Sequence, residues 1–287
     1  MTLWETGTLL MKGGSYLSLA ALCGGLLASG WFATRATERW IRGYTLVGAV
    51  GTALLVSLHF LVQVGALAEN GLRGMVDPML ASLLWESGVG STFAWRELAA
   101  LMALLLLCIR TLSVVGQRLL MLVSFLAVAV SFSQSGHSAE QGLWVQLALG
   151  THALIALLWI GMLLPLWLQL RREQDELAKQ LLTRFGKLAT VLVPVLLLAG
   201  AWVGWRLAAG NLPALWRTAY GEGLALKLVL VVGLLLLALL NRNLLVPRLP
   251  STRGLLLRSI RAEKALVLAI IVVTLVISTL MGPEVSE

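Results

Sequence analysis

The stretch LWVQLALGTHALIALLWIGMLLPLWL, residues 143–168, contains no charged side chain. A helix needs roughly 20 mainly apolar residues to cross the ~30 Å hydrocarbon core of a bilayer. Lipid offers no hydrogen-bond partner to backbone groups, so such a segment crosses as a helix or as part of a closed barrel. The stretch is too long for a barrel strand and its apolar residues do not alternate with polar ones. It therefore predicts a transmembrane helix.

Seven further apolar runs follow the same pattern and are separated by short charged stretches. The predicted spans are residues 15–34, 43–66, 96–112, 118–134, 143–168, 188–208, 223–242 and 264–282. The chain is 59% hydrophobic and 13% charged, with a mean hydropathy of +0.88. A soluble domain usually carries about 25% charged residues. The sequence thus predicts an all-α, polytopic membrane protein, with residues 1–287 forming one eight-helix transmembrane domain.

The net charge of +8 is concentrated on one side of this predicted bundle. The loops after spans one, three, five and seven hold 16 of the 22 Lys and Arg residues. The positive-inside rule places such loops in the cytoplasm, so both termini are expected on the outer side. We therefore expect a multi-pass protein of the bacterial inner membrane with periplasmic termini. The same distribution accounts for the basic charge without nucleic-acid binding.

A weak internal repeat links two segments that enter the membrane from the outer side. Residues 84–96, LWESGVGSTFAWR, and residues 215–227, LWRTAYGEGLALK, share the pattern LWx[ST]xxGxxxAx[RK]. An even number of predicted spans separates the copies, so they have the same orientation. The repeat predicts two parallel four-helix halves, 1–142 and 143–287, as in some transporters. The alternative is a chance match in an apolar chain of low diversity.

The chain has only three histidines, and all three fall in the outer half of the predicted bundle. At 1.5 Å per helical residue, His59 lies ~10 Å and His152 ~14 Å below the outer surface. His137 lies in the outer loop 135–142 or at the tip of span four. Polar side chains at such depth usually face the bundle interior. We expect the three imidazoles to converge on one pocket, unless each only hydrogen-bonds a neighbouring helix.

Two methionines in the long outer segment 67–95, Met75 and Met79, add soft donors on the same side. Imidazole suits copper or zinc, and thioether sulfur selects Cu(I). Although the two residues have helical spacing, Pro78 argues against one continuous helix there. Only neutral imidazole binds metal, so affinity should fall below about pH 6. The predicted copper ligands are His59, His137, His152, Met75 and Met79.

Carboxylates are sparse inside the predicted spans. Glu97 follows Arg96, and Glu263 is next to Arg261 and Lys264 in sequence. We expect both carboxylates to form local ion pairs at the membrane surface, with no deeper carboxylate available for a proton relay. No nucleotide-binding, hydrolase or redox-disulfide motif occurs, so the sequence predicts a protein that is not an enzyme.

Three motifs resemble those of the copper resistance protein D family (CopD/PcoD). They are Ser135-Gly136-His137-Ser138, His152-x6-Trp159-Ile160-Gly161 and Thr218-x-Tyr220-Gly221-x-x-Leu224-x-x-Lys227. The resemblance implies copper uptake from the periplasm and a periplasmic copper-binding partner of the CopC type. It assigns metal binding to His137 and His152, whereas His59 is added by depth alone. Ser138 replaces an alanine common in the family, and without a fused CopC-like domain we expect the donor to be a separate chain.

The leading hypothesis is an inner-membrane transporter or uptake component that takes copper from the periplasmic side through the outer-half His and Met site. Its expected partners are the copper ion, the CopC-type protein and the lipid bilayer, with no nucleic acid. One alternative is a membrane b-type haem protein for electron transfer, with His59 and His152 as axial ligands. Another is a helical interaction protein whose histidines carry no cofactor.

Overall fold

The computed structural model describes residues 3–109, 111–134, 141–207 and 218–280, in which every regular element is helical. The elements are α1 (Leu3–Trp31), α2 (Glu38–Ala68), the 3-10 helix η1 (Gly71–Val76), α3 (Pro78–Trp85), α4 (Gly88–Cys108), α5 (Val114–Ser133), α6 (Leu143–Arg172), α7 (Asp175–Leu207), α9 (Ala219–Leu240), the π-helical turn η2 (Asn241–Leu245) and α10 (Arg253–Leu280). Eight helices in these ranges are long and apolar enough to cross a membrane. The all-α fold and the eight predicted spans are confirmed.

Several helices begin well before the predicted spans. The first helix begins at Leu3 and the sixth spanning helix, α7, at Asp175. Hydropathy detects only the apolar part of a helix, whereas polar turns continue it; acidic residues such as Asp175 are favourable in a first turn. The outer segment 67–95 is likewise mostly helical, because it contains η1, α3 and the first turns of α4.

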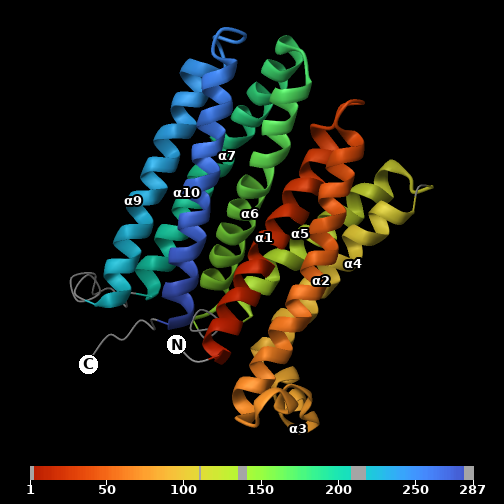
Figure 1. The fold of residues 1–287 in the computed structure, drawn as a ribbon, viewed down its shortest axis with the longest axis vertical. Coiled ribbons are helices and arrows are strands. Elements are labelled where there is room, and N and C mark those ends of the chain that lie inside the picture. Colours follow the sequence, from red (N-terminus) through yellow and green to blue (C-terminus); the bar gives the residue numbers. More distant parts are fainter. Residues whose placement is uncertain (1–2, 110, 135–140, 208–217, 281–287) are drawn as a thin grey trace.

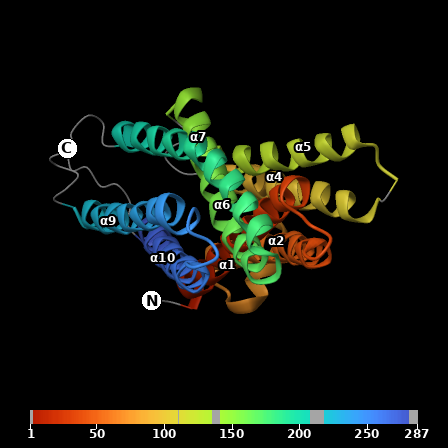
Figure 2. The ribbon, with the colours of Figure 1, turned by 90° about the horizontal axis from the view of Figure 1, so that it is seen from above.

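Two long helices, α1 and α6, form the centre of the bundle (Figures 1 and 2). Helix α1 packs against α2 and α6, and α6 also packs against α5 and α7. The group α2, α4 and α5 lies on one side of this central pair, and α7, α9 and α10 lie on the other (Figure 2). The start of α1 and the end of α10 lie at the same end of the bundle, called the terminal end below (Figure 1).

The backbones of α1 and α6 touch where two glycines meet. A Cβ atom on Gly161 would lie 1.8 Å from the carbonyl oxygen of Ala20, and one on Gly24 would lie 2.1 Å from the carbonyl carbon of Gly161. Small residues permit this close approach of membrane helices. The hydroxyl group of Tyr44 in α2 donates a hydrogen bond of 3.0 Å to the Gly161 carbonyl oxygen. The glycine of the Trp159-Ile160-Gly161 motif therefore has a packing role.

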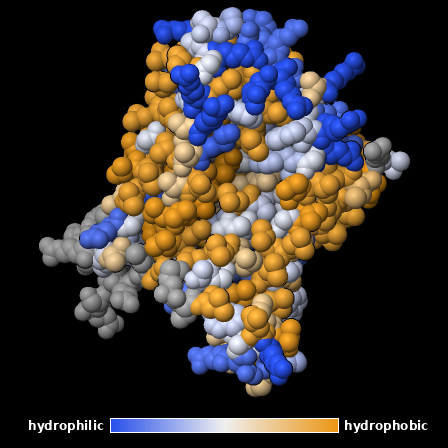
Figure 3. Space-filling view, in the orientation of Figure 1, coloured by the Kyte–Doolittle hydropathy of each residue, from blue (hydrophilic) through white to orange (hydrophobic). Residues whose placement is uncertain are grey.

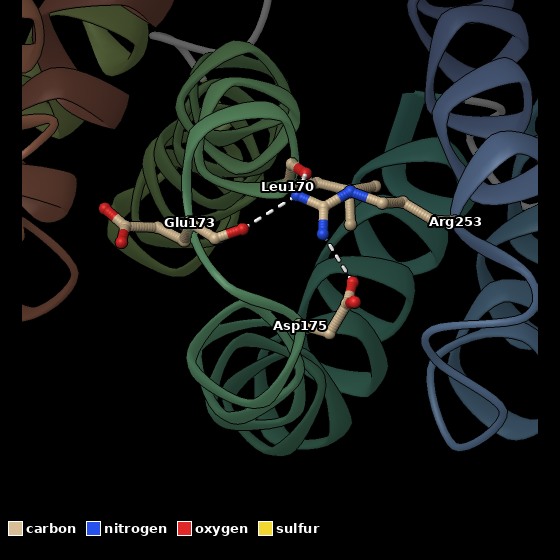
Figure 4. A network of polar contacts seen from close by, with 4 residues as sticks. All are labelled: Leu170, Glu173, Asp175 and Arg253. Atoms are coloured by element: carbon tan, nitrogen blue, oxygen red, sulfur yellow. Dashed lines mark hydrogen bonds and ion pairs between the residues drawn. The ribbon is translucent and has the colours of Figure 1, made fainter.

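The end of the bundle opposite the termini, called the basic end, is polar on its surface. Figure 3 shows hydrophilic side chains gathered there above a broad apolar belt. Arg253 at the start of α10 forms an ion pair with Asp175 and donates hydrogen bonds to the carbonyl oxygens of Leu170 and Glu173 (Figure 4). This network ties the α6–α7 turn to α10.

Candidate functional site

A cavity of about 640 Å³ lies in the half of the bundle toward the terminal end. Its lining comes from the first halves of α1 and α4, from the second halves of α2, α7 and α10, and from the middle of α9, with Phe132 of α5 and residues 149–160 of α6. Most of its wall is aliphatic or aromatic. The charged, imidazole and amide side chains in the wall are Lys12, His59, Gln63, Arg96, His152 and Lys227.

The imidazole of His152 is held by the backbone of α7. Its Nδ1 lies 2.9 Å from the carbonyl oxygen of Leu196. A carbonyl oxygen only accepts, so Nδ1 carries the hydrogen and a neutral ring leaves the lone pair of Nε2 available. Gly200 makes room for the ring, because a Cβ atom there would lie 2.8 Å from both Cε1 and Nδ1 of His152. A ligating histidine usually donates its other N–H in this way.

The second cavity histidine, His59, contacts a side chain of its own helix. The amide nitrogen of Gln63, one turn further along α2, lies 3.2 Å from Nδ1 and 3.3 Å from Nε2 of the ring. The amide nitrogen donates, so the ring nitrogen that accepts carries no hydrogen. The side chain of His59 is half-buried, as is that of His152. Two imidazoles from separate helices thus line one cavity.

The remaining predicted ligands lie elsewhere. His137 lies outside the described residues. Met75 packs on α2, where a Cβ atom on Gly65 would lie 2.7 Å from its Cγ, and the side chain of Met79 is 80% exposed on α3. Neither methionine lines the cavity. Across the described ranges no group of three or more His, Cys, Asp or Glu side chains could hold a metal ion.

Pro78 separates two helices and is the first residue of the second one. Helix η1 ends at Val76, and α3 starts at Pro78 with Asp77 as its N-cap. The Asp77 carboxylate accepts hydrogen bonds from the backbone N–H groups of Met79 (2.9 Å) and Leu80 (3.0 Å). Proline is well suited to the first helical position because its missing N–H needs no partner there. The prediction that the two methionines do not share one continuous helix is confirmed.

The expected ion pairs of the membrane carboxylates are wrong. The carboxylate of Glu97 accepts a hydrogen bond of 3.1 Å from Ser57, and its neighbour Arg96 turns away from it. Glu263 is 5% exposed and accepts a hydrogen bond of 2.7 Å from the amide of Asn241. Among the described residues, the structure has an ion pair at the basic end instead, between Arg253 and Asp175. Sequence neighbours point to different faces of a helix, which explains why adjacency failed as a guide.

The inward-facing cations of the cavity were missed by reasoning from the sequence. Lys12, Arg96 and Lys227 each line the cavity. The internal repeat could have identified two of them, because Arg96 and Lys227 occupy the last, basic position of its two copies. Trp159 also lines the cavity, two turns after His152 on α6.

Eight spanning helices around an internal cavity define the class: a multi-pass membrane protein. A family model described as Copper resistance protein D-like, N-terminal domain, matches residues 1–147, and one described as Copper resistance protein D matches residues 179–277. The chain belongs to the copper resistance protein D family.

A curated relative points to the same function. The chain is 28% identical to the Copper transport protein CutJ of Bacillus subtilis (strain 168) over 251 residues, which cover 83% of this chain and 45% of that protein. The chain thus spans less than half the length of this relative. No solved structure matches the chain. The family and the relative support a role in copper transport or resistance.

Proposed function

We propose that the protein takes up copper from its terminal end and binds it in the cavity between His59 and His152. The observation that carries this proposal is that both imidazoles, from α2 and α6, line one cavity. The hydrogen bond from His152 Nδ1 to the Leu196 carbonyl oxygen directs Nε2 as the ligating atom. Nitrogen ligands of this kind suit copper.

The distribution of charge supports an orientation in which the cavity faces outward. The basic end carries most Lys and Arg residues and is the cytoplasmic end by the positive-inside rule. The cavity would then face the periplasm of an inner-membrane protein, where a copper-binding partner of the CopC type would deliver the metal. The narrow crossing of α1 and α6 at Gly24 and Gly161 lies on the cytoplasmic side of the cavity. Copper release would require these helices to move.

The b-type haem protein is the second candidate, and the same observation favours it. Haem iron can be held by two imidazoles from different helices, and His59 and His152 line a cavity of about 640 Å³. Copper is preferred because the family and the relative concern copper. The visible spectrum of the purified protein separates the two candidates.

The test is the metal content and spectrum of the detergent-purified protein after copper is offered. We expect about one bound copper and no haem absorption band. His152→Gln keeps an amide N–H that can reach the Leu196 carbonyl oxygen but replaces the ligating nitrogen, so copper should be lost while the fold is kept. Gln117→Ala, which changes an exposed polar side chain of α5 outside the cavity, is the control and should keep copper. A haem band, or unchanged copper affinity in both His59→Ala and His152→Gln, would refute the copper site.

A further inference from the structure

The cavity is electropositive in a way that a copper site alone does not explain. Three cationic side chains line it, one each from α1, α4 and α9: Lys12, Arg96 and Lys227. No carboxylate is among the lining residues that the structure describes. A positively charged side chain is costly at membrane depth unless it has a partner. The cavity thus carries positive charge that no described acidic residue offsets.

Arg96 is the most deeply buried of the three, at 5% exposure. Its Nε donates to the hydroxyl oxygen of Ser131 at 3.4 Å, and its guanidinium carbon lies 4.9 Å from the ring centre of Phe132 and 5.7 Å from that of Tyr16. These partners are neutral. Aromatic faces stabilise a cation by about 0.5–2 kcal/mol, which falls short of an ion pair in a dry site.

Among the described residues, the two lysines have no acidic partner either. Lys12 donates to the carbonyl oxygen (3.2 Å) and hydroxyl oxygen (3.0 Å) of Ser278 and to the hydroxyl oxygen of Thr279 (3.1 Å), all neutral acceptors. The ammonium group of Lys227 has no acceptor within the described parts of the chain. Each cavity histidine has a cation within electrostatic range: Lys12 and Arg96 act on His59, and Lys227 on His152.

The internal repeat places two of these cations in equivalent positions. Ser87 is the N-cap of α4 and Thr218 is the N-cap of α9, each accepting a backbone N–H at 3.1 Å. Nine residues after each cap stands the basic residue, Arg96 or Lys227, ~14 Å along the helix axis. The two helices therefore have similar caps and each carries one cation, at the same distance from its cap, into the same cavity.

The cavity walls also limit the kind of anion that would fit. Apart from Lys227, Thr274 and Ser278, the lining from α9 and α10 is aliphatic, including Leu234, Val267 and Ile271. Helices α7 and α9 both line the cavity, although α7 packs mainly against α6 and α9 mainly against α10. We propose that the cavity binds an anionic amphiphile, whose acidic group lies among Lys12, Arg96 and Lys227 and whose apolar chain lies along α9 and α10.

The ligand chemistry is one acidic group on a hydrocarbon chain, which a fatty acid or an anionic phospholipid supplies. Its binding does not depend on the copper proposal, because among the described residues no hydrogen bond joins the three cations to His59 or His152. It bears on that proposal nonetheless, because the cations lie within electrostatic range of both histidines and a bound anion would offset their repulsion of a copper ion. Anion binding is therefore measured on copper-free protein, so that either proposal can fail alone.

The experiment is native mass spectrometry of the full chain in a non-ionic detergent, after removal of lipid. The added ligands are oleate, methyl oleate, dioleoyl phosphatidylglycerol and dioleoyl phosphatidylcholine. We expect one equivalent of oleate or of phosphatidylglycerol to bind, and its uncharged or zwitterionic counterpart to bind roughly tenfold or more weakly. Preference for oleate identifies a free carboxylate, and preference for phosphatidylglycerol identifies a lipid headgroup.

Three variants locate the site. Arg96→Gln and Lys227→Gln should each weaken binding of the preferred anion roughly tenfold or more, as expected for a charge that loses its buried partner. Arg73→Gln removes an exposed cation of η1 outside the cavity and should leave binding unchanged. Equal binding of charged and uncharged ligands would overturn the proposal, as would equal losses in all three variants or full displacement by chloride.

Measurements of thermal unfolding show whether the variants still fold. In the absence of anion, Arg96→Gln removes an uncompensated charge, so its unfolding temperature should equal or exceed that of the wild type. Oleate or phosphatidylglycerol should raise the unfolding temperature of the wild type and raise that of Arg96→Gln much less. A large loss of stability in the anion-free variant would mean that Arg96 is structural, and would contradict the proposal.

Discussion

Helices α1 and α6 have different roles at the two ends of the bundle. Toward the basic end, α1 and α6 pack backbone to backbone at Gly24 and Gly161, and side chains such as Leu26 and Leu170 are fully buried. Toward the terminal end the same two helices diverge around a cavity of about 640 Å³ that contains His59 and cationic side chains. Lipid gives no hydrophobic force between helices, so close packing of small residues holds the bundle together. A functional cavity can then exist only where that packing is relaxed.

The largest expected effect comes from forcing the packed half apart. Gly161→Leu would place a side chain where a Cβ atom already lies 1.8 Å from the Ala20 carbonyl oxygen. We expect a loss of about 3 kcal/mol or more, the upper part of the range for overpacking, and little monodisperse protein. Gly233→Leu is the control, because nothing lies within 4 Å of a Cβ atom at Gly233 on α9. Thermal unfolding and size-exclusion chromatography measure both, and equal behaviour would refute the crossing.

The next prediction tests the cavity and leaves the packed crossing of α1 and α6 intact. Gly200→Ala would bring a Cβ atom within 2.8 Å of the ring of His152 and should displace its hydrogen bond to the Leu196 carbonyl oxygen. Loss of such an outer partner typically weakens metal binding 10–100-fold, so copper affinity should fall by about that factor. Gly204→Ala, one turn further along α7, meets nothing within 4 Å and should bind copper normally. Competition titration with a copper chelator gives both affinities; unchanged affinity in Gly200→Ala would exclude His152 as an oriented ligand.

A smaller effect is expected at the basic end. Arg253→Gln would remove the ion pair to Asp175 and the hydrogen bonds to two carbonyl oxygens of the α6–α7 turn. The side chains of Arg253 and Asp175 are 29% and 34% exposed, so solvent screens the pair and we expect a loss of only about 1 kcal/mol. Copper and anion binding should not change, since the network lies far from the cavity. A reduced copper affinity would mean that the two halves are coupled.

The fold could be predicted from the sequence because bilayer thickness fixes span length. Runs of apolar residues predicted all eight spans. They did not predict where the helices begin and end, since α10 begins at Arg253, 11 residues before the predicted start. Polar turns outside the bilayer carry no hydropathy signal, although they continue the helix. The parallel halves 1–142 and 143–287 stay a prediction, supported locally by the matching caps Ser87 and Thr218.

The site could be predicted only in part. Depth along the helix placed His59 and His152 in one half of the bundle, and both line the cavity there. Depth does not give the rotation of a helix about its axis. The sequence therefore could not show that Arg96 lines the cavity whereas its neighbour Glu97 does not. Metal binding by His137, Met75 and Met79 stays a prediction, and His137 falls outside the described residues.

The smallest effect is expected at Met79, whose thioether was assigned to copper on the basis of its side of the membrane. Its side chain is 80% exposed on α3 and does not line the cavity, so it can meet copper outside the bundle but cannot complete the imidazole site without a movement of α3. Met79→Leu keeps size and hydrophobicity while removing the sulfur. The equilibrium affinity for copper should therefore stay within about twofold of the wild type, a change below 0.5 kcal/mol, whereas loading by stopped-flow mixing can slow. A tenfold loss of equilibrium affinity would mean that the outer segment folds over the cavity when copper binds, and would extend the site from α2 and α6 to α3.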